Sequence, residues 1–351
     1  MYIENINIKN LRILKNLQFA PSKHINLITG SNGSGKSSLL ESIYLLARSR
    51  SFRTNNYINL INKDEKEIII SANLIKDSDQ KIKIGLKKSS NNTELYIAGH
   101  KQKKVSHQAR LIPLGIITTN SQKLLNEGPK TKRKFLNWGV FHVEHTYSDL
   151  MIKYNKILIQ RNSALRTKDR GYRAWDNQLI KYGKEITTLR KKYLNYFEFE
   201  MNKLLKGYEA FKNIRIIYKQ GWKSEKSLED VIFESDETLL RYTLYGPHRA
   251  DLGIYIEDKS VQEILSSGQL KLLSILLIIA QLKLINKYLG EAPILLFDDF
   301  QSELDNYNQQ LLIQTIKELD IQMFITSIDF NLFFEDGFKG ELFHVEHGEI
   351  Y

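Results

Sequence analysis

The sequence predicts an α/β fold in which a mixed sheet with a phosphate-binding loop, joined to an antiparallel β subdomain, is interrupted by a mostly α-helical insertion. The glycine-rich loop, residues 30–37 (GSNGSGKS), lies near the start, whereas residues 265–269 (LSSGQ) and 294–299 (ILLFDD), which would complete the same site, lie more than 200 residues later. Between them the pattern changes from alternating to helical. We therefore expect a nucleotide-binding domain of residues 1–118 plus 241–351 and an inserted helical domain of residues 119–240.

The glycine-rich loop has the flanks that a phosphate-binding loop requires. Residues 24–29 alternate like a strand and residues 38–46 have helical spacing. Glycines allow positive φ and bring N–H groups close to phosphate oxygens, and the helix N-terminus adds partial positive charge. Lys36 is expected to reach the β and γ phosphates of ATP, and Ser37 to hold Mg²⁺. The predicted nucleotide contacts here are Gly30, Ser31, Asn32, Gly33, Ser34, Gly35, Lys36, Ser37 and Ser38.

Two carboxylates follow a buried strand near the end of the chain. Residues 294–297 are all apolar, and Asp298 and Asp299 emerge where ligands bind in parallel sheets. Asp298 is expected to hold Mg²⁺, and Asp299 to orient or deprotonate the attacking water, so Asp299 and Lys36 are the predicted catalytic residues. A strand that enters a polar turn looks the same, but the phosphate loop favours the nucleotide interpretation.

The motif at residues 265–269 opens the most apolar segment of the chain. The apolar stretch Leu272–Ala280 is flanked by lysines and is too short to cross a bilayer, which predicts a buried helix and no membrane partner. The motif then lies at a helix N-terminus, a second anion site or a plain N-cap. In ABC-type ATPase heads such a loop meets the γ phosphate held by the other protomer, which predicts an ATP-dependent homodimer. The predicted contacts are Ser266, Ser267, Gly268 and Gln269, and residues 302–305 (SELD) favour this interpretation.

Four more motifs lie outside the nucleotide site: residues 50–54 (RSFRT), 128–136 (GPKTKRKFL), 160–165 (QRNSAL) and 245–252 (YGPHRADL). With them the chain resembles, along nearly its whole length, the RecF family of bacterial recombination-mediator ATPases, which are ABC-type and SMC-like. The resemblance implies binding of single-stranded DNA and of gapped or junction duplexes. It also implies loading of the RecA recombinase, with RecR and RecO as partners, in DNA repair, replication and the SOS response.

Three positions depart from the family pattern. Residues 119–122 (TNSQ) replace the usual Pro-Glu-like pair, so Gln122 is carried over by resemblance as the metal-probing residue. Asp299 replaces the usual Glu, and residues 323–327 (MFITS) offer hydroxyls where a transporter ATPase has a switch His. We expect slow, DNA-stimulated ATP hydrolysis that serves as a switch.

Positive charge is concentrated in the middle of the chain. The net charge is +11, and residues 130–192 alone hold 16 basic and 5 acidic residues, interleaved with Tyr and Trp. Such side chains neutralise DNA phosphates without sequence preference, although a solvated helical face has the same composition. The arginines of this segment are Arg133, Arg161, Arg166, Arg170, Arg173 and Arg190.

Composition and periodicity support expectations about disulfides, location in the cell, the antiparallel sheet and the length of the helical insertion. The absence of Cys rules out disulfides and thiolate metal sites, and the first residues lack a signal-peptide pattern, so we expect a cytoplasmic protein. Residues 67–75, 81–87 and 94–98 alternate as an antiparallel sheet would. Helical patterns at residues 149–165 and 175–208 span at most roughly 50 Å, which excludes a long coiled-coil arm.

Three other functions share some of these features. A transporter's ATPase subunit has the same nucleotide motifs but docks on a membrane protein. A nuclease on a similar head needs an added acidic metal cluster, and a structural DNA binder would ignore nucleotide. DNA affinity measured with ATP, with ADP and without nucleotide separates the last of these from the switch.

Some conspicuous residues have more than one interpretation. The repeated sequence HVEH at residues 142–145 and 344–347 could bind metal, but the two copies are expected in a helix and near a strand, so the same spacing gives different geometry. Arg50 and Arg53 could contact nucleotide or DNA or simply lie on the surface. The family resemblance suggests that His248 and Arg249 couple the helical insertion to the nucleotide loops.

Overall fold

The computed structural model describes residues 1–351 except 91, 103–104, 302–303, 329, 331–332 and 334–339. Contacts divide the described chain into two compact units. The first unit contains Met1–Ser121 and Ile285–Tyr351, and the second contains Gln122–Leu284. Both ends of the chain therefore build the first unit.

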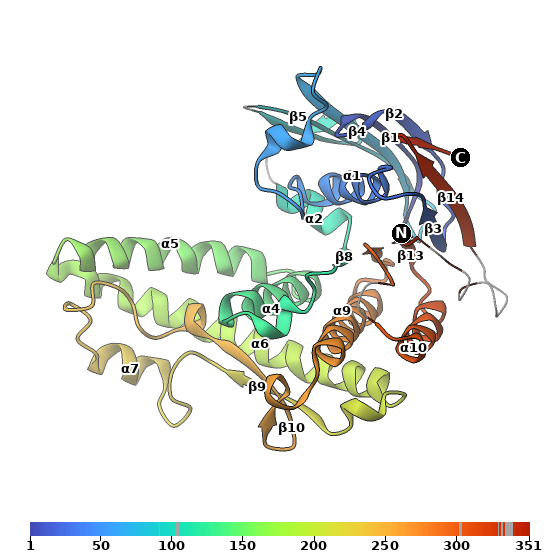
Figure 1. Ribbon diagram of the computed structural model, residues 1–351. Helices are drawn as coiled ribbons and strands as arrows, with labels where there is room; N and C mark the ends of the chain where they lie inside the picture. The colour runs from blue at the N-terminus through green and yellow to red at the C-terminus, as the bar shows by residue number, and fades with distance from the viewer. Residues whose placement is uncertain (91, 103–104, 302–303, 329, 331–332, 334–339) are drawn as a thin grey trace. The chain divides into compact units, whose positions relative to one another are not determined.

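An antiparallel sheet forms one layer of the first unit, with the strand order β2-β1-β4-β5-β6-β7 (Figure 1). Strand β1 pairs with both β2 and β4, and alternate residues such as Ile6 and Ile8 are fully buried, which is the period of a sheet with one face on the core. The strands are β1 (Tyr2–Leu11), β2 (Leu14–Phe19), β4 (Glu67–Ile75), β5 (Lys81–Ser89), β6 (Thr93–Ile97) and β7 (His100–Lys101).

A mixed sheet forms the other layer, with the order β15-β14-β3-β13-β12-β8. Its strands β8, β12, β13, β3 and β14 are parallel, and β15 pairs antiparallel with β14. Because parallel strands end at the same edge, the loops after β3, β12 and β13 lie together there. The strands are β3 (Ile25–Thr29), β8 (Leu114–Ile117), β12 (Ile294–Phe297), β13 (Gln322–Thr326), β14 (Gly340–Glu346) and β15 (Glu349–Ile350).

Helix α1 (Lys36–Arg48) fills the core of the first unit (Figure 1). Its side chains Leu39, Leu40 and Ile43 belong to one apolar cluster with residues of both sheets, including Ile6 and Phe324. Burial of this face fixes the helix, and with it the glycine-rich loop that precedes it. The other helices of the unit are η1 (Tyr57–Leu60), α2 (Val105–Leu111) and α10 (Asn306–Lys317).

The second unit is mostly helical. Helices α5 (Tyr147–Arg166) and α6 (Asp176–Leu205) pack side by side, and the 30 residues of α6 reach about 45 Å (Figure 1). A small antiparallel sheet has the order β11-β10-β9. The other elements are α3 (Lys123–Asn126), α4 (Pro129–Val143), η2 (Arg170–Trp175), η3 (Glu209–Phe211), β9 (Ile214–Lys219), α7 (Leu228–Glu234), η4 (Pro247–Arg249), β10 (Asp251–Ile256), β11 (Lys259–Ser260) and α8 (Val261–Ile264). Helix α9 (Ser267–Leu289) begins in this unit, and its last residues, from Ile285 on, belong to the first.

Helix α9 is the apolar segment that follows the motif at residues 265–269. By length and composition it is the one helix in the described part of the chain that could cross a bilayer, but 78% of its most apolar stretch is buried within the protein. A buried core helix meets the same criteria, and this burial agrees with the interpretation from sequence.

Sequence periodicity located most elements closely. The strand predicted at residues 67–75 coincides with β4, the strand predicted at residues 24–29 contains β3, and the predicted long helices correspond to α5 and α6. Residues 241–284, predicted to join the nucleotide-binding domain, pack in the second unit, where β10 pairs with β9 and Gln281 of α9 donates to the Tyr193 hydroxyl at 2.8 Å. The division of the chain into an ATP-binding head and an inserted arm remains a prediction.

Candidate nucleotide-binding site

The loop between β3 and α1 needs glycine at three positions. Gly30, Gly33 and Gly35 have φ values of 146°, 83° and 123°, which side chains rarely adopt. A Cβ at Gly30 would lie 2.2 Å from the Val345 carbonyl oxygen, and one at Gly35 would lie 3.1 Å from a Leu14 methyl group. The backbone thus has both the conformation and the close packing of a phosphate-binding loop.

The β14–β15 hairpin supports this loop from the other end of the chain. Strand β14 pairs in parallel with β3, with His344 opposite Thr29, which brings Val345 over Gly30. The backbone N–H of Gly348 donates to the carbonyl of Ser34 at 3.0 Å. Residues near the C-terminus therefore hold the loop in place.

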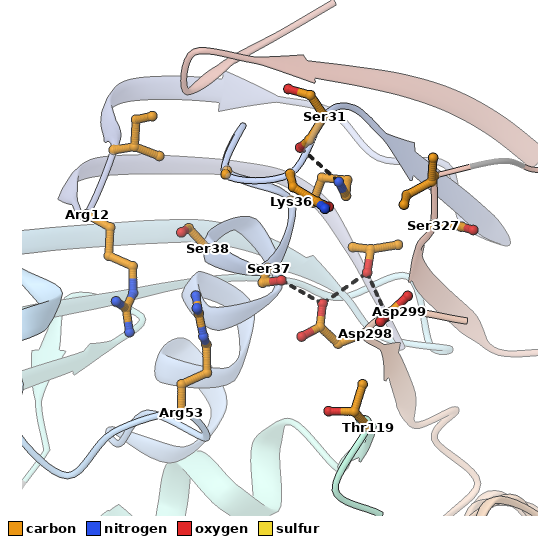
Figure 2. A pocket seen from close by; sticks show the side chains of 16 residues that line it. Arg12, Ser31, Lys36, Ser37, Ser38, Arg53, Thr119, Asp298, Asp299 and Ser327 are labelled. Atoms are coloured by element: carbon orange, nitrogen blue, oxygen red, sulfur yellow. Dashed lines mark hydrogen bonds between the residues drawn. The ribbon is translucent and has the colours of Figure 1, made fainter. Parts of the chain in front are cut away.

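Lys36 begins α1 at the edge of a cavity and turns back onto its own loop (Figure 2). Its Nζ donates to the carbonyl oxygens of Gly30 at 2.5 Å and Ser31 at 3.0 Å. Burial lowers the pKa of the Lys36 ammonium, while Asp299 and Asp298 act in the opposite direction. The ammonium thus lies among carbonyl oxygens that phosphate oxygens could replace.

A hydroxyl–carboxylate cluster lies beside Lys36 (Figure 2). The hydroxyls of Ser37 and Thr326 donate to Asp298 Oδ1 at 2.8 Å and 3.0 Å, and the Asp299 N–H donates to Thr326 Oγ1 at 2.8 Å. Asp299 is exposed, with a φ of 62° that is uncommon outside glycine. Hydroxyl and carboxylate oxygens are ligands that Mg²⁺ accepts, so Ser37 and Asp298 fit the predicted metal site.

The cavity at this site has a volume of about 520 Å³. Figure 2 shows Arg12 and Arg53 at one end and Asp298, Asp299 and Ser327 at the other. Gly30 and Ser34 shape the loop but do not line the cavity. The predicted residues that line it are Ser31, Asn32, Gly33, Gly35, Lys36, Ser37, Ser38, Asp298 and Asp299.

Arg12 is a cavity residue that the sequence did not reveal. It lies between β1 and β2, and its guanidinium contacts the fully buried Glu41 of α1 through Nε at 2.5 Å and Nη2 at 3.2 Å. Ser51 also donates to Glu41. No sequence motif surrounds Arg12. Its position at the cavity depends on its contact with Glu41 of α1, which is distant in the sequence.

The motif at residues 265–269 forms a reciprocal helix cap. The Ser266 N–H donates to Gln269 Oε1 at 2.9 Å, and the Gln269 N–H donates to Ser266 Oγ at 3.3 Å. Ser266 and Ser267 are exposed at the start of α9, and Gly268 is half-buried. The helix N-terminus is therefore confirmed, and it belongs to the second unit whereas the phosphate loop belongs to the first.

Gln122 is not among the residues that line the cavity, and two other predicted residues lie outside the described part of the chain. Gln122 belongs to the second unit, at the start of α3, and its Oε1 is buried without a hydrogen-bond partner. Its predicted metal role gains no support from this position. Ser302 and Glu303 lie outside the described residues.

Two arginines assigned to a DNA-binding face are instead structural. Arg161 is buried and pairs with Asp176 at 2.8 Å and with Glu237. Arg190 is 1% exposed and donates to the Tyr147 hydroxyl at 3.0 Å. Charge counting could not detect this burial, so the expectation was wrong for both. Arg133 is half-buried, Arg166 and Arg173 are exposed, and the side chain of Arg170 lies outside the described part of the structure.

The HVEH repeats do not share a geometry. The first begins in α4, where His142 is buried, and the second overlaps the end of β14. Within the described ranges, no group of three or more His, Cys, Asp or Glu side chains is arranged to hold a metal ion.

Comparison with known proteins gives full-length matches. The family model described as the RecF/RecN/SMC N-terminal domain matches residues 2–349. The DNA replication and repair protein RecF of Shewanella frigidimarina (strain NCIMB 400) is 36% identical over 361 residues, covering 100% of this chain and 99% of that protein. The protein of the same name from Shewanella oneidensis is 35% identical over 363 residues, with the same coverage.

Solved structures agree. The structure described as the recombination mediator protein RecF-ATP in the RecFOR pathway superposes with a TM-score of 0.87 at 28% identity, covering 100% of this chain and 97% of that one. An Smc head bound to the C-winged helix domain of ScpA has a TM-score of 0.60 at 17% identity, covering 100% and 96%, and shows a shared fold. The predicted head fold with an antiparallel sheet and a helical insertion is confirmed, and the chain belongs to the RecF family of DNA replication and repair proteins.

Proposed function

We propose that this protein is an ATP-switched, DNA-binding recombination mediator. One arrangement carries the proposal: the hydroxyl of Ser37 and the carboxylate of Asp298 lie in contact beside the Lys36 ammonium, in a cavity formed by a glycine-rich loop. These are the parts that bind a nucleoside triphosphate with its metal. A relative that superposes over the full chain is described as a complex with ATP.

Ser37 and Asp298 would hold Mg²⁺, which neutralises charge on the β and γ phosphates when bound. Lys36 would exchange its loop carbonyls for phosphate oxygens. Asp299 would orient the attacking water and accept its proton. Since Thr326 contacts both the Asp298 carboxylate and the Asp299 backbone, its hydroxyl would keep the two aspartates in a fixed position relative to each other. A short Asp in place of Glu favours slow hydrolysis.

ATP would also join two copies of the chain. The start of α9 is exposed, and the first N–H groups of a helix lack intrahelical partners. Together with the helix dipole they favour an anion. We propose that Ser266, Ser267, Gly268 and Gln269 of one copy contact the γ phosphate held by the other.

The closed dimer would bind single-stranded DNA and gapped or junction duplexes, and hydrolysis would release it. Loading of RecA with RecR and RecO belongs to the same proposal, supported by a relative described as part of the RecFOR pathway. We also place the protein in the cytoplasm.

Sedimentation velocity with and without ATP and Mg²⁺ tests the switch. The wild type should shift from monomer to dimer with ATP. Lys36→Met should lose both ATP binding and dimerisation, whereas Ser266→Arg should keep ATP binding and stay monomeric. Ser163→Arg, at an exposed position on α5, is the matched control and should dimerise.

Dimerisation of both Lys36→Met and Ser266→Arg with ATP would refute the sandwich arrangement. A wild type that remains monomeric with ATP, Mg²⁺ and gapped DNA would refute the switch itself. Binding of a fluorescent ATP analogue, measured in parallel, separates loss of nucleotide from loss of dimer contacts.

A further inference from the structure

We propose that a second cavity, the α4 pocket, holds a phosphate group of DNA. The pocket has a volume of about 700 Å³, lies entirely in the second unit, and is lined by residues that include Lys130, Thr131, Arg133, Tyr242, His248 and Arg249. The motifs at residues 128–136 and 245–252, which the nucleotide site does not use, meet here. The inference rests on the proposed DNA-binding function and assigns a site for it.

The start of α4 has an unfavourable charge arrangement for an isolated helix. A helix N-terminus carries partial positive charge and favours acidic residues in its first turn. The first turn of α4 contains no acidic residue and its N-cap Gly128 has no side-chain cap, whereas residues 130–134 read KTKRK. Glu127, just before the helix, also lines the pocket, and its carboxylate accepts a hydrogen bond from the Thr131 hydroxyl at 2.6 Å. A bound anion would offset this concentration of positive charge.

Two guanidinium groups are held in place at the pocket. Arg133 Nη1 donates to the Ala250 carbonyl at 2.7 Å, and the Arg249 guanidinium lies 5.1 Å from the centre of the Tyr242 ring. Burial lowers the pKa of Arg133, and Arg190 and Arg249 lower it further, against the opposing effect of Asp251. The cations therefore repel one another, which a phosphate between them would relieve.

Arg190 adds buried positive charge behind the pocket. It donates to the Pro247 carbonyl at 2.7 Å, to Asn137 Oδ1 at 2.8 Å, and to the hydroxyls of Tyr147 and Tyr218, all neutral acceptors. The equally buried Arg161 instead pairs with two carboxylates. A buried cation without a carboxylate is costly, so a bound anion nearby is favoured.

His248 positions this wall of the pocket without adding charge. Its Nε2–H donates to the Thr243 carbonyl at 3.1 Å, and its Nδ1 accepts from the Tyr154 hydroxyl at 2.7 Å. Burial lowers the pKa of His248 to about 4, so the ring is neutral at pH 7. These contacts fix the turn that carries Arg249.

The ligand chemistry follows from these groups. A guanidinium matches two phosphate oxygens, and an ammonium adds a point charge. The partial positive charge at the start of α4 also favours an anion, although its first residue, Pro129, has no N–H. Lys130 and Arg249 are exposed and able to reach such a ligand. The phosphate could be an internal diester or the terminal phosphate at a gap.

Salt-dependent binding of a fluorescently labelled gapped duplex, with ATP and Mg²⁺, tests the pocket. The variants are Lys130→Gln and Arg249→Gln. The matched control is Lys203→Gln, which removes the same charge from an exposed position on α6, outside the pocket and outside the basic segment of residues 130–192. Each lost phosphate contact should reduce the slope of log K against log salt by about 0.9, which weakens binding at 0.1 M salt by about eightfold. Binding of the ATP analogue should not change.

Duplexes with a 5′-phosphate or a 5′-hydroxyl at the gap distinguish the two phosphate sources. Equal losses on both indicate a diester, and a loss only on the phosphorylated duplex indicates the terminal group. As a check on the wild type, acylation of Lys130, measured by mass spectrometry, should fall when DNA is bound while Lys203 still reacts.

The pocket assignment is wrong if both pocket variants match Lys203→Gln in affinity and slope while the wild type binds DNA. That result leaves the proposed function intact. If the wild type shows no ATP-dependent DNA binding, the proposed function fails and the pocket assignment fails with it.

Discussion

The close approach of the C-terminal hairpin to the glycine-rich loop makes Gly30→Ala a sharp test of how the site is held together. The substitution places a methyl group 2.2 Å from the Val345 carbonyl oxygen at a φ of 146°. Real Cβ atoms essentially never come within 3.0 Å of another heavy atom in this way, so backbone must move. Gly33→Ala is the matched control, because φ is also positive there, at 83°, but nothing lies within 4 Å.

The two substitutions should differ in free energy of unfolding. Each forces a side chain into an unfavourable backbone region, which costs about 1–3 kcal/mol at Gly30 and about 1–2 kcal/mol at Gly33. Only Gly30→Ala adds overpacking against a strand backbone, worth about 1–3 kcal/mol. We therefore expect a loss of about 4 kcal/mol for Gly30→Ala and about 1.5 kcal/mol for Gly33→Ala.

Thermal unfolding measures the difference directly. For domains of about 150–250 residues, 1 kcal/mol shifts Tm by roughly 2–4 °C. Gly30→Ala should thus lower Tm by about 8–16 °C and Gly33→Ala by about 3–6 °C. ATP affinity should also fall for Gly30→Ala, because Val345 and the loop cannot both keep their places.

Equal losses of stability in the two variants would show that the contact with the Val345 carbonyl adds nothing, since the cost of the unfavourable backbone conformation alone would then explain both losses. A third variant, Val345→Ala, keeps the carbonyl in place. Combined with Gly30→Ala it should not restore stability, because the clash involves the backbone oxygen rather than the side chain.

Three further predictions concern single side chains. Arg12→Ala leaves the carboxylate of Glu41 buried without its cation and should destabilise the protein by about 3–5 kcal/mol in urea unfolding, whereas a loss below 1 kcal/mol would show that the pair is dispensable. The pKa of His248 is about 4 in the folded protein against an ordinary 6.5, so the unfolded chain binds more protons than the folded protein between these pH values. The free energy of unfolding that depends on the neutral His248 ring is therefore fully present above pH 6.5. It falls by up to about 3 kcal/mol as the pH drops to 4. His248→Gln should lack this component in urea titrations across that range, and an identical pH profile would contradict the assignment. Thr326→Val removes the hydroxyl shared by Asp298 and Asp299 and should slow ATP turnover by about 10-fold or more with little change in ATP affinity, while unchanged turnover would exclude a positioning role.

Local sequence patterns determined much of this protein. The order of strand, glycine-rich loop and helix depends on neighbouring residues, and Ser266 and Gln269 can cap a helix because they are three positions apart. Alternation located β4 to the residue, because a strand with one buried face has an apolar residue at every second position. The strand–loop–helix order around the glycine-rich loop, the place of the aspartates after β12 and the helical insertion were predictable because each depends on residues that are close together in the sequence.

Tertiary structure alone decided the rest. Val345 packs on Gly30 because β14 pairs with the distant strand β3, and Arg12 reaches Glu41 because the turn after β1 lies against helix α1. No spacing rule in the sequence specifies those partners. The burial of charged side chains was not predictable from the sequence either. Arg161 and Arg190 are buried, whereas Arg166 and Arg173, in the same basic segment, are exposed. Whether a cation faces a carboxylate, a neutral hydroxyl or water depends on packing in three dimensions, since electrostatic and desolvation energies follow distance through space and not separation along the chain.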